Sequence, residues 1–203
     1  EEILGKVLWR WVRRDQIVLA TKVFGDEDPS WRGLSRRIIM RQIDNSLKRL
    51  QTDYVDLYQI HRWDPVTPIE ETMEALNDVV RAGKARYIGA SSMYAWQFAK
   101  AQQVAKENGW ARFTSMQNQV NLIYREEERE MIPLCLDQGV GLIPWSPIAR
   151  GKLARPVSIS TARAETDNVL ENMYSKTIDA DNAVISNVEK IASKIGRPMV
   201  QVA

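Results

Sequence analysis

The stretch DYVDLYQIHRWDP, residues 53–65, decides how the rest of the chain is interpreted. Its middle, Val55–Ile60, is mostly apolar or aromatic and shows no helical stripe, which predicts a strand buried on both faces of a parallel sheet. The strand ends at His61, the only histidine in the chain, and a polar, turn-prone run follows. A lone histidine is more often structural than catalytic. Because chemistry in α/β proteins gathers where strands give way to loops, His61 is nevertheless a candidate functional residue.

Length and composition limit the class of protein. The 203 residues suffice for one substantial core, so we expect a single domain over residues 1–203. The 28 basic and 26 acidic residues are scattered and leave a net charge of +2, which gives no nucleic-acid footprint. Cys135 is the only cysteine, which excludes an intrachain disulfide and argues against a cysteine-rich metal site. We therefore expect no metal, and a reduced, cytoplasmic setting.

The two ends of the sequence show no membrane or targeting signal. No apolar run approaches the ~18 residues of a membrane span, and no signal-peptide pattern opens the chain. Residues 1–11 have the pattern of the interior of an amphipathic helix without a preceding cap, and its apolar residues are expected on one face: Ile3, Leu4, Val7, Leu8 and Trp11. Gly196 closes a helix, and Arg197-Pro198 opens another just before the sequence stops. We expect material to be missing from both ends.

Strand and helix patterns alternate along the chain. Strands are predicted at residues 17–20, 55–60, 86–90, 113–119 and 140–145. Polar residues recur near their carboxyl ends, at Lys22, His61, Ser91, Gln117 and Ser146, and subtraction gives intervals of 39, 30, 26 and 29 residues. Such a repeating βα module predicts right-handed βαβ units and a parallel sheet. A barrel of eight units needs roughly 250 residues. A doubly wound sheet would fit the length, but its GxGxxG fingerprint is absent.

Helix signals lie between these strands. Ser35 is a predicted cap, and Thr67-Pro68-Ile69-Glu70 is a predicted capping box with proline at the first helical position. Glycines mark the expected helix ends at positions 83, 109 and 139, the last of these closing a helix over residues 126–137. Residues 157–177 form a polar segment in which we expect an irregular loop, and a last amphipathic helix follows.

Five motifs at the predicted strand ends resemble the aldo-keto reductase family, most closely its fungal aryl-alcohol dehydrogenase-like branch. They are ATK (20–22), TDYVDLYQIH (52–61), IGASS (88–92), QNQVN (117–121) and PWSPIARGKL (144–153). The resemblance implies an α/β fold, a TIM (β/α)8 barrel of which this chain carries about five of eight units. It also implies NADPH bound across the carboxyl-end face, without a Rossmann domain. The implied activity is the reduction of aldehydes or ketones, aryl or aliphatic, to alcohols by hydride transfer.

The resemblance assigns catalytic roles to Lys22 and His61. A buried ammonium lowers the pKa of a neighbouring phenol, and a neutral imidazole can donate a hydrogen bond that polarises a carbonyl. By position alone, Lys22 also fits a surface lysine that begins a loop. The family's tetrad also needs an aspartate and a tyrosine, whose motifs would precede residue 1. None of the six tyrosines lies in the matching motif.

The same resemblance assigns the cofactor residues. Ser91, Ser92 and Gln117 would hold the nicotinamide carboxamide, although many family members carry Ser-Asn in place of Ser91-Ser92. Trp145 would stack on the nicotinamide ring, a position that otherwise fits plain core. Ser146, Ile148 and Gly151, with Lys152 nearby, would line the diphosphate. The choice of NADPH over NADH follows family habit, because the segment that grips the 2′-phosphate has no match.

Several alternatives stay open from the sequence. A non-catalytic NADPH-binding regulatory subunit on the same scaffold, and an inactive truncated reductase, both fit the unmatched tyrosine and aspartate. A sugar-phosphate isomerase on another barrel fits only the βα repeat. The substrate is expected to be a small carbonyl compound with pocket walls in the 24–34 loop and the loop at Trp63. The oligomeric state is not predicted.

Overall fold

The computed structural model describes residues 1–203 apart from 26–27, 160, 162–165, 167–172 and 176. The chain forms two compact units. Unit 1 contains residues 1–118 and 130–143, and unit 2 contains residues 119–129 and 144–203. Each unit is described by itself, and the expectation of a single domain stays a prediction.

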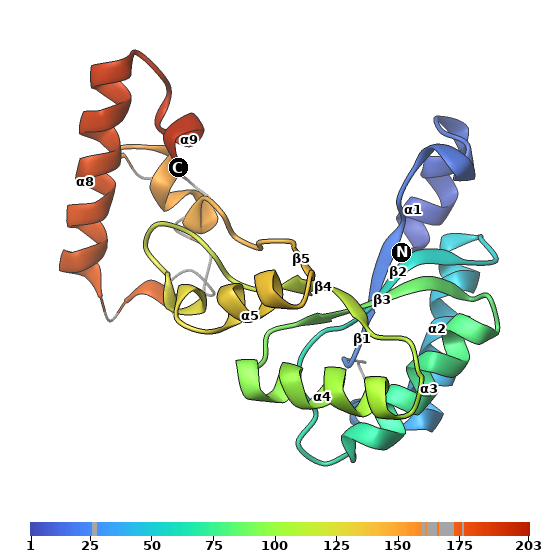
Figure 1. The fold of residues 1–203 in the computed structure, drawn as a ribbon. Coiled ribbons are helices and arrows are strands. Elements are labelled where there is room, and N and C mark those ends of the chain that lie inside the picture. The colour runs from blue at the N-terminus through green and yellow to red at the C-terminus, as the bar shows by residue number, and fades with distance from the viewer. Residues whose placement is uncertain (26–27, 160, 162–165, 167–172, 176) are drawn as a thin grey trace. The chain divides into compact units, whose positions relative to one another are not determined.

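A parallel sheet forms the centre of unit 1 (Figure 1). Its five strands are β1 (Ala20–Val23), β2 (Val55–Ile60), β3 (Ala85–Ser91), β4 (Phe113–Gln117) and β5 (Gly141–Leu142). They lie in chain order, each paired in parallel with the next. A doubly wound sheet reverses its strand order part-way, whereas a barrel adds every strand on the same side. The order therefore confirms the predicted α/β fold of five parallel strands alternating with helices, consistent with part of a (β/α)8 barrel.

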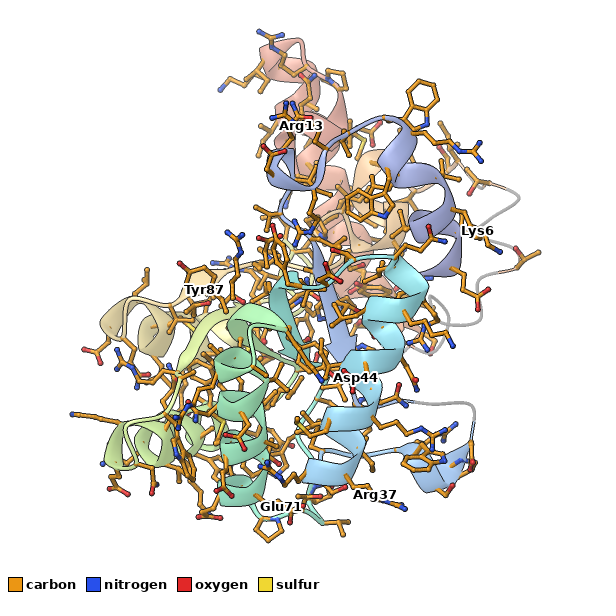
Figure 2. The ribbon with its side chains drawn as sticks, turned by 90° about the vertical axis from the view of Figure 1, so that its right-hand side faces the viewer. Lys6, Arg13, Arg37, Asp44, Glu71 and Tyr87 are labelled. Atoms are coloured by element: carbon orange, nitrogen blue, oxygen red, sulfur yellow. The ribbon has the colours of Figure 1, made fainter. Side chains whose placement is uncertain are left out.

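Helices cover one face of this sheet. They are α2 (Arg36–Leu50), α3 (Ile69–Arg81), α4 (Ala95–Glu107) and the short α5 (Met131–Asp137), and α3 packs between α2 and α4. Tyr58 and Ile60 of β2 are fully buried, and the Tyr58 hydroxyl donates to the Ile39 carbonyl of α2 at 3.4 Å. In Figure 2, Arg37 and Asp44 lie along α2 and Glu71 lies at the start of α3. The apolar core is thus the space between the sheet and these helices.

The opposite face of the sheet carries the polar side chains. Because strand side chains alternate, Leu57, Gln59 and His61 point away from Tyr58 and Ile60. Lys22 of β1 is paired in register with Gln59 and shares that face. In a (β/α)8 barrel the face turned away from the helices is the barrel interior, and its carboxyl end holds the chemistry.

Several predicted boundaries are wrong. Strand β1 begins at Ala20, three residues later than predicted, because it pairs with β2 through Val23 and Ile60. Strand β5 has two residues instead of six. The predicted 126–137 helix is divided into a 3-10 helix, Glu126–Glu128, and α5.

The predicted capping box before α3 is also wrong. Pro68 is the N-cap, and no side chain caps the helix. The Thr67 hydroxyl instead donates to Asp64 Oδ2 at 2.7 Å. Ser35 is the N-cap of α2 as predicted, but its side chain makes no cap hydrogen bond.

The apolar face predicted for the first helix is not buried. Helix α1 (Glu2–Val7) continues into a 3-10 helix, Leu8–Arg10. Ile3 and Trp11 are 79% and 82% exposed, and Leu4 and Val7 are also exposed. The buried residue is Gly5, where a Cβ would clash with the Arg49 carbonyl at the end of α2. Backbone contact at a glycine therefore attaches α1, and the Trp9 indole adds a hydrogen bond of 2.9 Å to the Leu50 carbonyl.

Unit 2 has a smaller core of its own. It contains a 3-10 helix (Ala149–Ala154), α8 (Ile178–Ile195) and α9 (Met199–Val202). Among the described residues, the buried core consists of Ala149, Leu153, Tyr174, Ile185, Val188, Ala192 and Met199. Gly196 is left-handed and ends α8, as predicted. Most of the predicted 157–177 loop lies outside the described residues.

Two kinds of feature are absent from the described residues. No helix in the described part of the chain combines the length and apolar character needed to cross a membrane. No group of three histidine, cysteine, aspartate or glutamate side chains is arranged there to hold a metal ion.

Candidate active site

Lys22 and His61 lie side by side at the carboxyl ends of neighbouring strands. The backbone N–H of His61 donates to the Val23 carbonyl at 2.8 Å, which fixes the start of the loop after β2 against the end of β1. Both side chains are on the sheet face that the helices leave uncovered, and both are exposed. Lys22 is therefore not the buried ammonium that its expected role implied.

The surroundings of His61 favour its neutral form. Partial burial lowers the pKa of its imidazole, and the positive charges of Lys22 and Arg62 lower it further. At pH 7 the ring is therefore uncharged and has one N–H donor and one acceptor nitrogen. This is the protonation state needed to donate a hydrogen bond to a carbonyl oxygen without a net charge on the ring.

The ends of β3 and β4 bring three of the predicted cofactor residues together. Ser91 is buried, and its hydroxyl donates to the Gln117 carbonyl at 2.6 Å. The Ser91 and Ser92 hydroxyl oxygens are 3.4 Å apart. Ser92 has a left-handed backbone, with φ of 50°, which is uncommon for a residue with a side chain. The Ser91 oxygen can still accept a hydrogen bond, so this edge offers an acceptor to an amide group.

A row of small and polar residues continues across the sheet from Lys22. Gln59, Gly89 and Ser115 are paired in register on successive strands. Gln59 and Ser115 are almost fully buried, and within the described part of the chain neither Gln59 Oε1 nor Ser115 Oγ has a hydrogen-bond partner. Buried polar atoms of this kind are normally satisfied by protein or water, so the row marks a polar layer of the sheet level with Lys22.

In unit 2 the predicted diphosphate residues form one tight turn. Ser146 has φ of 55°, and Ala149, Arg150 and Gly151 also have positive φ. The turn closes on itself, because the Ala149 N–H donates to the Ser146 carbonyl, the Arg150 N–H to Ser146 Oγ and the Gly151 N–H to the Ile148 carbonyl. The proton of the Ser146 hydroxyl stays available as a donor.

A polar network supports this turn. The QNQVN motif reaches it because the Asn121 amide donates to the Ser146 carbonyl at 3.0 Å, and residue 119 pairs with Trp145 as an isolated bridge. The amides of residues 119 and 121 also donate to the Tyr174 hydroxyl oxygen. Lys152 Nζ lies 3.1 Å from the buried Asp181 carboxylate and 5.1 Å from the Tyr174 ring centre. Lys152, whose ammonium is predicted to lie near the diphosphate, therefore already forms an ion pair with Asp181.

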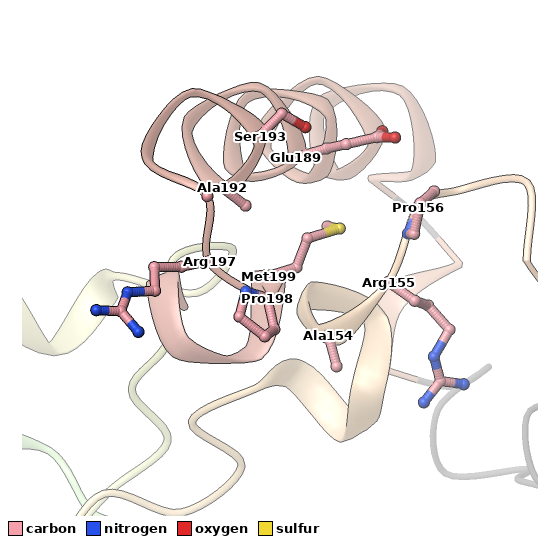
Figure 3. Close-up of a pocket in the computed structure, with 10 residues that line it drawn as sticks. Ala154, Arg155, Pro156, Glu189, Ala192, Ser193, Arg197, Pro198 and Met199 are labelled. Carbon is pink, nitrogen blue, oxygen red and sulfur yellow. The ribbon is translucent and has the colours of Figure 1, made fainter.

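Unit 2 also has a hollow of about 430 Å³ beneath α8 (Figure 3). Its lining consists of Ala154, Arg155, Pro156, Glu189, Ala192, Ser193, Gly196, Arg197, Pro198 and Met199. In Figure 3 the guanidinium groups of Arg155 and Arg197 point away from it. None of the predicted site residues lines this hollow.

The comparisons with known proteins agree with the strand-end motifs. The model of the aldo/keto reductase family matches residues 1–203, which is the whole chain. The chain belongs to the aldo/keto reductase family.

Curated relatives of the chain include aldo/keto reductases from fungi. The chain is 52% identical over 225 residues to a versiconal hemiacetal acetate reductase of Aspergillus parasiticus, covering 100% of this chain and 65% of the relative. It is 43% identical over 232 residues to a "putative aryl-alcohol dehydrogenase" of Schizosaccharomyces pombe, covering 100% and 64%. An aldo-keto reductase of Metarhizium robertsii is 49% identical over 230 residues, covering 100% and 62%. The chain therefore spans less than two thirds of the length of these relatives.

The aldo/keto reductase residues are divided between the two units. Unit 1 holds Lys22, His61, Ser91, Ser92 and Gln117. Unit 2 holds Trp145, Ser146, Ile148, Gly151 and Lys152. Within each unit the structure brings its own set together, and the roles of these residues stay predictions.

Sequence reasoning did not identify every polar residue at the site. Asp64 was interpreted only as part of a turn, and Gln59 only as part of a buried strand. Gln59 carried a signal, because a glutamine two residues before His61 must share its face of the strand. Asp181 and Tyr174 carried no comparable signal.

Proposed function

We propose that this protein is an NADPH-dependent reductase that converts a small aldehyde or ketone to the alcohol. The observation that carries the proposal is the placement of Lys22 and a neutral His61 near each other, at the ends of adjacent strands and on the same face of the sheet. It gains support from membership of the aldo/keto reductase family over the whole chain. An aryl or aliphatic carbonyl substrate and a cytoplasmic setting are parts of the same proposal.

The two residues have complementary chemical roles in such a reaction. The His61 N–H donates to the substrate carbonyl oxygen, orienting it and stabilising the negative charge that develops there. The Lys22 ammonium adds a positive charge beside that oxygen, and it lowers the pKa of any neighbouring proton donor. When bound, the nicotinamide supplies the hydride that reaches the carbonyl carbon. Partial burial and then the charge of Lys22 lower the pKa of the His61 imidazole, so Lys22 also favours the neutral form that donates the hydrogen bond.

Each unit supplies its own set of proposed cofactor contacts. In unit 1, the Ser91 oxygen and the Gln117 side chain would hold a carboxamide, with Ser92 beside them. In unit 2, Trp145 would stack on a planar ring, and Ser146, Ile148, Gly151 and Lys152 would face phosphate. The preference for NADPH over NADH is proposed from the family alone.

The proposal is tested by cofactor binding and then by turnover. NADPH and NADH are titrated into the protein while tryptophan fluorescence is followed, and saturable quenching that favours NADPH is expected. Lys22→Met and His61→Ala are each expected to lower kcat/KM for aldehydes by at least about 10²-fold. Lys100→Met is the control, because Lys100 is exposed on α4. Unchanged turnover in both site variants would contradict the proposal.

A second candidate is a non-catalytic NADPH-binding subunit. It is favoured by the placement of Tyr58, the tyrosine nearest His61 in sequence. Its hydroxyl is bonded to the Ile39 carbonyl on the helix side of the sheet, and burial raises its pKa, so it cannot serve as proton donor to a carbonyl at His61. Saturable NADPH binding with no turnover of any aldehyde would support this candidate over the reductase.

A further inference from the structure

The carboxylate of Asp64 connects the two loops that leave β1 and β2. Asp64 lies three residues after His61 and is only 8% exposed. Its Oδ1 accepts the Val66 N–H at 2.9 Å, and its Oδ2 accepts the Thr67 hydroxyl at 2.7 Å. Oδ2 also accepts the N–H of Leu34, at the end of the 24–34 loop, at 2.8 Å. One side chain therefore holds its own loop in shape and attaches it to the neighbouring one.

These bonds belong to a closed ring around the two strand ends. The Gly33 N–H donates to the Phe24 carbonyl at 2.9 Å, which returns the first loop to the end of β1. The His61 N–H donates to the Val23 carbonyl, which joins the start of the second loop to the same strand. Asp64 supplies the link on the far side, between Leu34 and the second loop. Among the described residues, the other contacts between the two loops lie close to the strand ends, including the Arg62 guanidinium 5.5 Å from the centre of the Phe24 ring.

Gly33 is adapted to the approach of this carboxylate. Its φ is 111°, a conformation that favours glycine, and a Cβ on it would lie 2.8 Å from Asp64 Oδ2. The next residue, Leu34, is almost fully buried, and its carbonyl accepts the Thr72 hydroxyl of α3 at 3.1 Å. Leu34 is therefore fixed in the apolar core. The hydrogen bond from its N–H to Asp64 fixes the His61 loop to the same point.

The carboxylate is ionised in the folded protein. Burial alone would raise the pKa of Asp64, but the donors from Val66, Thr67 and Leu34 outweigh burial and lower it. No lysine or arginine of the described residues forms an ion pair with it. An ionised carboxylate held only by N–H and O–H donors fits a group that fixes loop geometry.

The loop that Asp64 holds carries an aromatic side chain next to His61. The Trp63 ring is half-buried and lies 6.1 Å from the Trp96 ring, centre to centre, at an interplanar angle of 58°. Trp96 belongs to the first turn of α4. The indole of Trp63 is thus held by an aromatic contact, and its backbone is held by the next residue.

We infer that Asp64 is a positioning residue that fixes the loops around His61 and so sets the orientation of the imidazole. Asp64 acts through the backbone and does not touch the reacting atoms. The consequence for catalysis rests on the proposed function, whereas the effect on His61 can be measured without turnover.

The test uses the fact that His61 is the only histidine in the chain. The protein is purified without a histidine tag, and the imidazole is titrated by NMR in wild type, Asp64→Ala and Asp28→Asn. Asp28 is the matched control, because its Oδ1 accepts the N–H and hydroxyl of Ser30 within the 24–34 loop, at 2.9 and 2.7 Å. Circular dichroism establishes that each variant is folded.

The positioning role predicts that the His61 pKa rises toward its ordinary value in Asp64→Ala and stays unchanged in Asp28→Asn. The rise occurs because a freed imidazole moves into water and away from Lys22 and Arg62. The simple loss of a nearby negative charge would lower the pKa, so the two effects differ in sign. An unchanged or lowered pKa in folded Asp64→Ala overturns the inference.

Asp64→Asn provides a second, milder variant if Asp64→Ala does not fold. Either orientation of its amide places an NH2 group against the N–H of Val66 or Leu34, so a smaller rise is expected, and no rise overturns the inference. In an active protein, Asp64→Ala should also lower kcat/KM by about 10²-fold. If the wild type reduces no aldehyde, the proposed function fails, and the histidine titration still decides the role of Asp64.

Discussion

Gly89 in the middle of β3 is predicted to resist even the smallest side chain. It lies in the polar row that starts at Lys22, between Gln59 and Ser115. A Cβ added to Gly89 would clash with Ser115 Oγ and lie 3.1 Å from Gln59 Cγ and 3.2 Å from Leu57 Cδ1. Its φ is outside the left-handed region, so packing and not backbone strain opposes alanine. Gly89→Ala therefore measures how closely the three strands approach on this face.

The expected cost follows from two opposing effects. Overpacking a well-packed site costs about 1–3 kcal/mol. Replacing glycine by alanine also restricts the unfolded chain, which stabilises the protein by about 0.4–1 kcal/mol where the backbone allows it. The Ser115 hydroxyl can rotate, whereas the two carbon contacts remain. The net destabilisation of Gly89→Ala is expected to be about 1–2 kcal/mol.

Gly141→Ala is the matched control. Gly141 lies in β5, also outside the left-handed region, and a Cβ there would meet only the Thr114 carbonyl oxygen, at an ordinary 3.6 Å. Gly141→Ala restricts the unfolded chain without overpacking the folded protein, so this substitution should be neutral or stabilising. The difference in unfolding free energy between Gly89→Ala and Gly141→Ala therefore gives the cost of overpacking, about 1–3 kcal/mol.

Urea unfolding followed by circular dichroism measures both variants, and Ser115→Ala completes a double-mutant cycle. Removing Ser115 Oγ breaks no hydrogen bond among the described residues, so Ser115→Ala should be neutral or stabilising by itself. In the Gly89→Ala background it should recover at least about 0.5 kcal/mol, because residues in contact couple. Equal stability of Gly89→Ala and Gly141→Ala, or no recovery by Ser115→Ala, would refute the packing argument.

Two further predictions concern carboxylates of unit 1. Asp56 Oδ2 accepts the Leu19 N–H at 2.8 Å and lies 2.7 Å from Arg14 Nη2, so Asp56→Ala should cost about 2–3 kcal/mol in urea unfolding. Asp15→Ala, which removes an exposed pair, should leave the unfolding free energy nearly unchanged; equal losses in the two variants would contradict the difference in burial. The pKa of Asp64 is lowered from its ordinary value of 3.8, so its ionised form stabilises the fold above that pH, and the contribution is lost as the pH falls through the folded value. The unfolding free energies of wild type and Asp64→Asn should therefore converge below about pH 4, and curves that stay parallel would exclude the linkage.

The positions of the chemically interesting residues could be predicted because they depend on local pattern and strand order. The buried run Val55–Ile60 predicted β2, and the polar residue after it marked the strand end. The recurrence of such ends predicted a parallel sheet, and the family resemblance predicted a barrel. The structure adds the strands in chain order, which places Lys22 near His61. Consecutive order in a parallel sheet is enough to make neighbours of residues far apart in sequence.

Boundaries and helix faces could not be predicted because tertiary contacts decide them. Strand β1 is set by its register with β2, although the apolar run begins earlier, and Val18 in that run is 82% exposed. Helix α1 has a good amphipathic pattern, yet Gly5 is the residue that meets α2. Hydrophobic periodicity reports which side chains could be buried, whereas the partner surface determines which are.

The polar contacts that shape the site could not be predicted from the sequence, for a related reason. Asp64 followed by proline has the composition of a turn, and its local bonds to Val66 and Thr67 agree with that interpretation. Its contact with Leu34 spans 30 residues and exists only because parallel strands bring two loops to the same edge. The strand order that places Lys22 beside His61 therefore also places the 24–34 loop beside Asp64. The neutral imidazole and the loop that carries it are consequences of one topology, which is why a change at Asp64 should be detectable at His61.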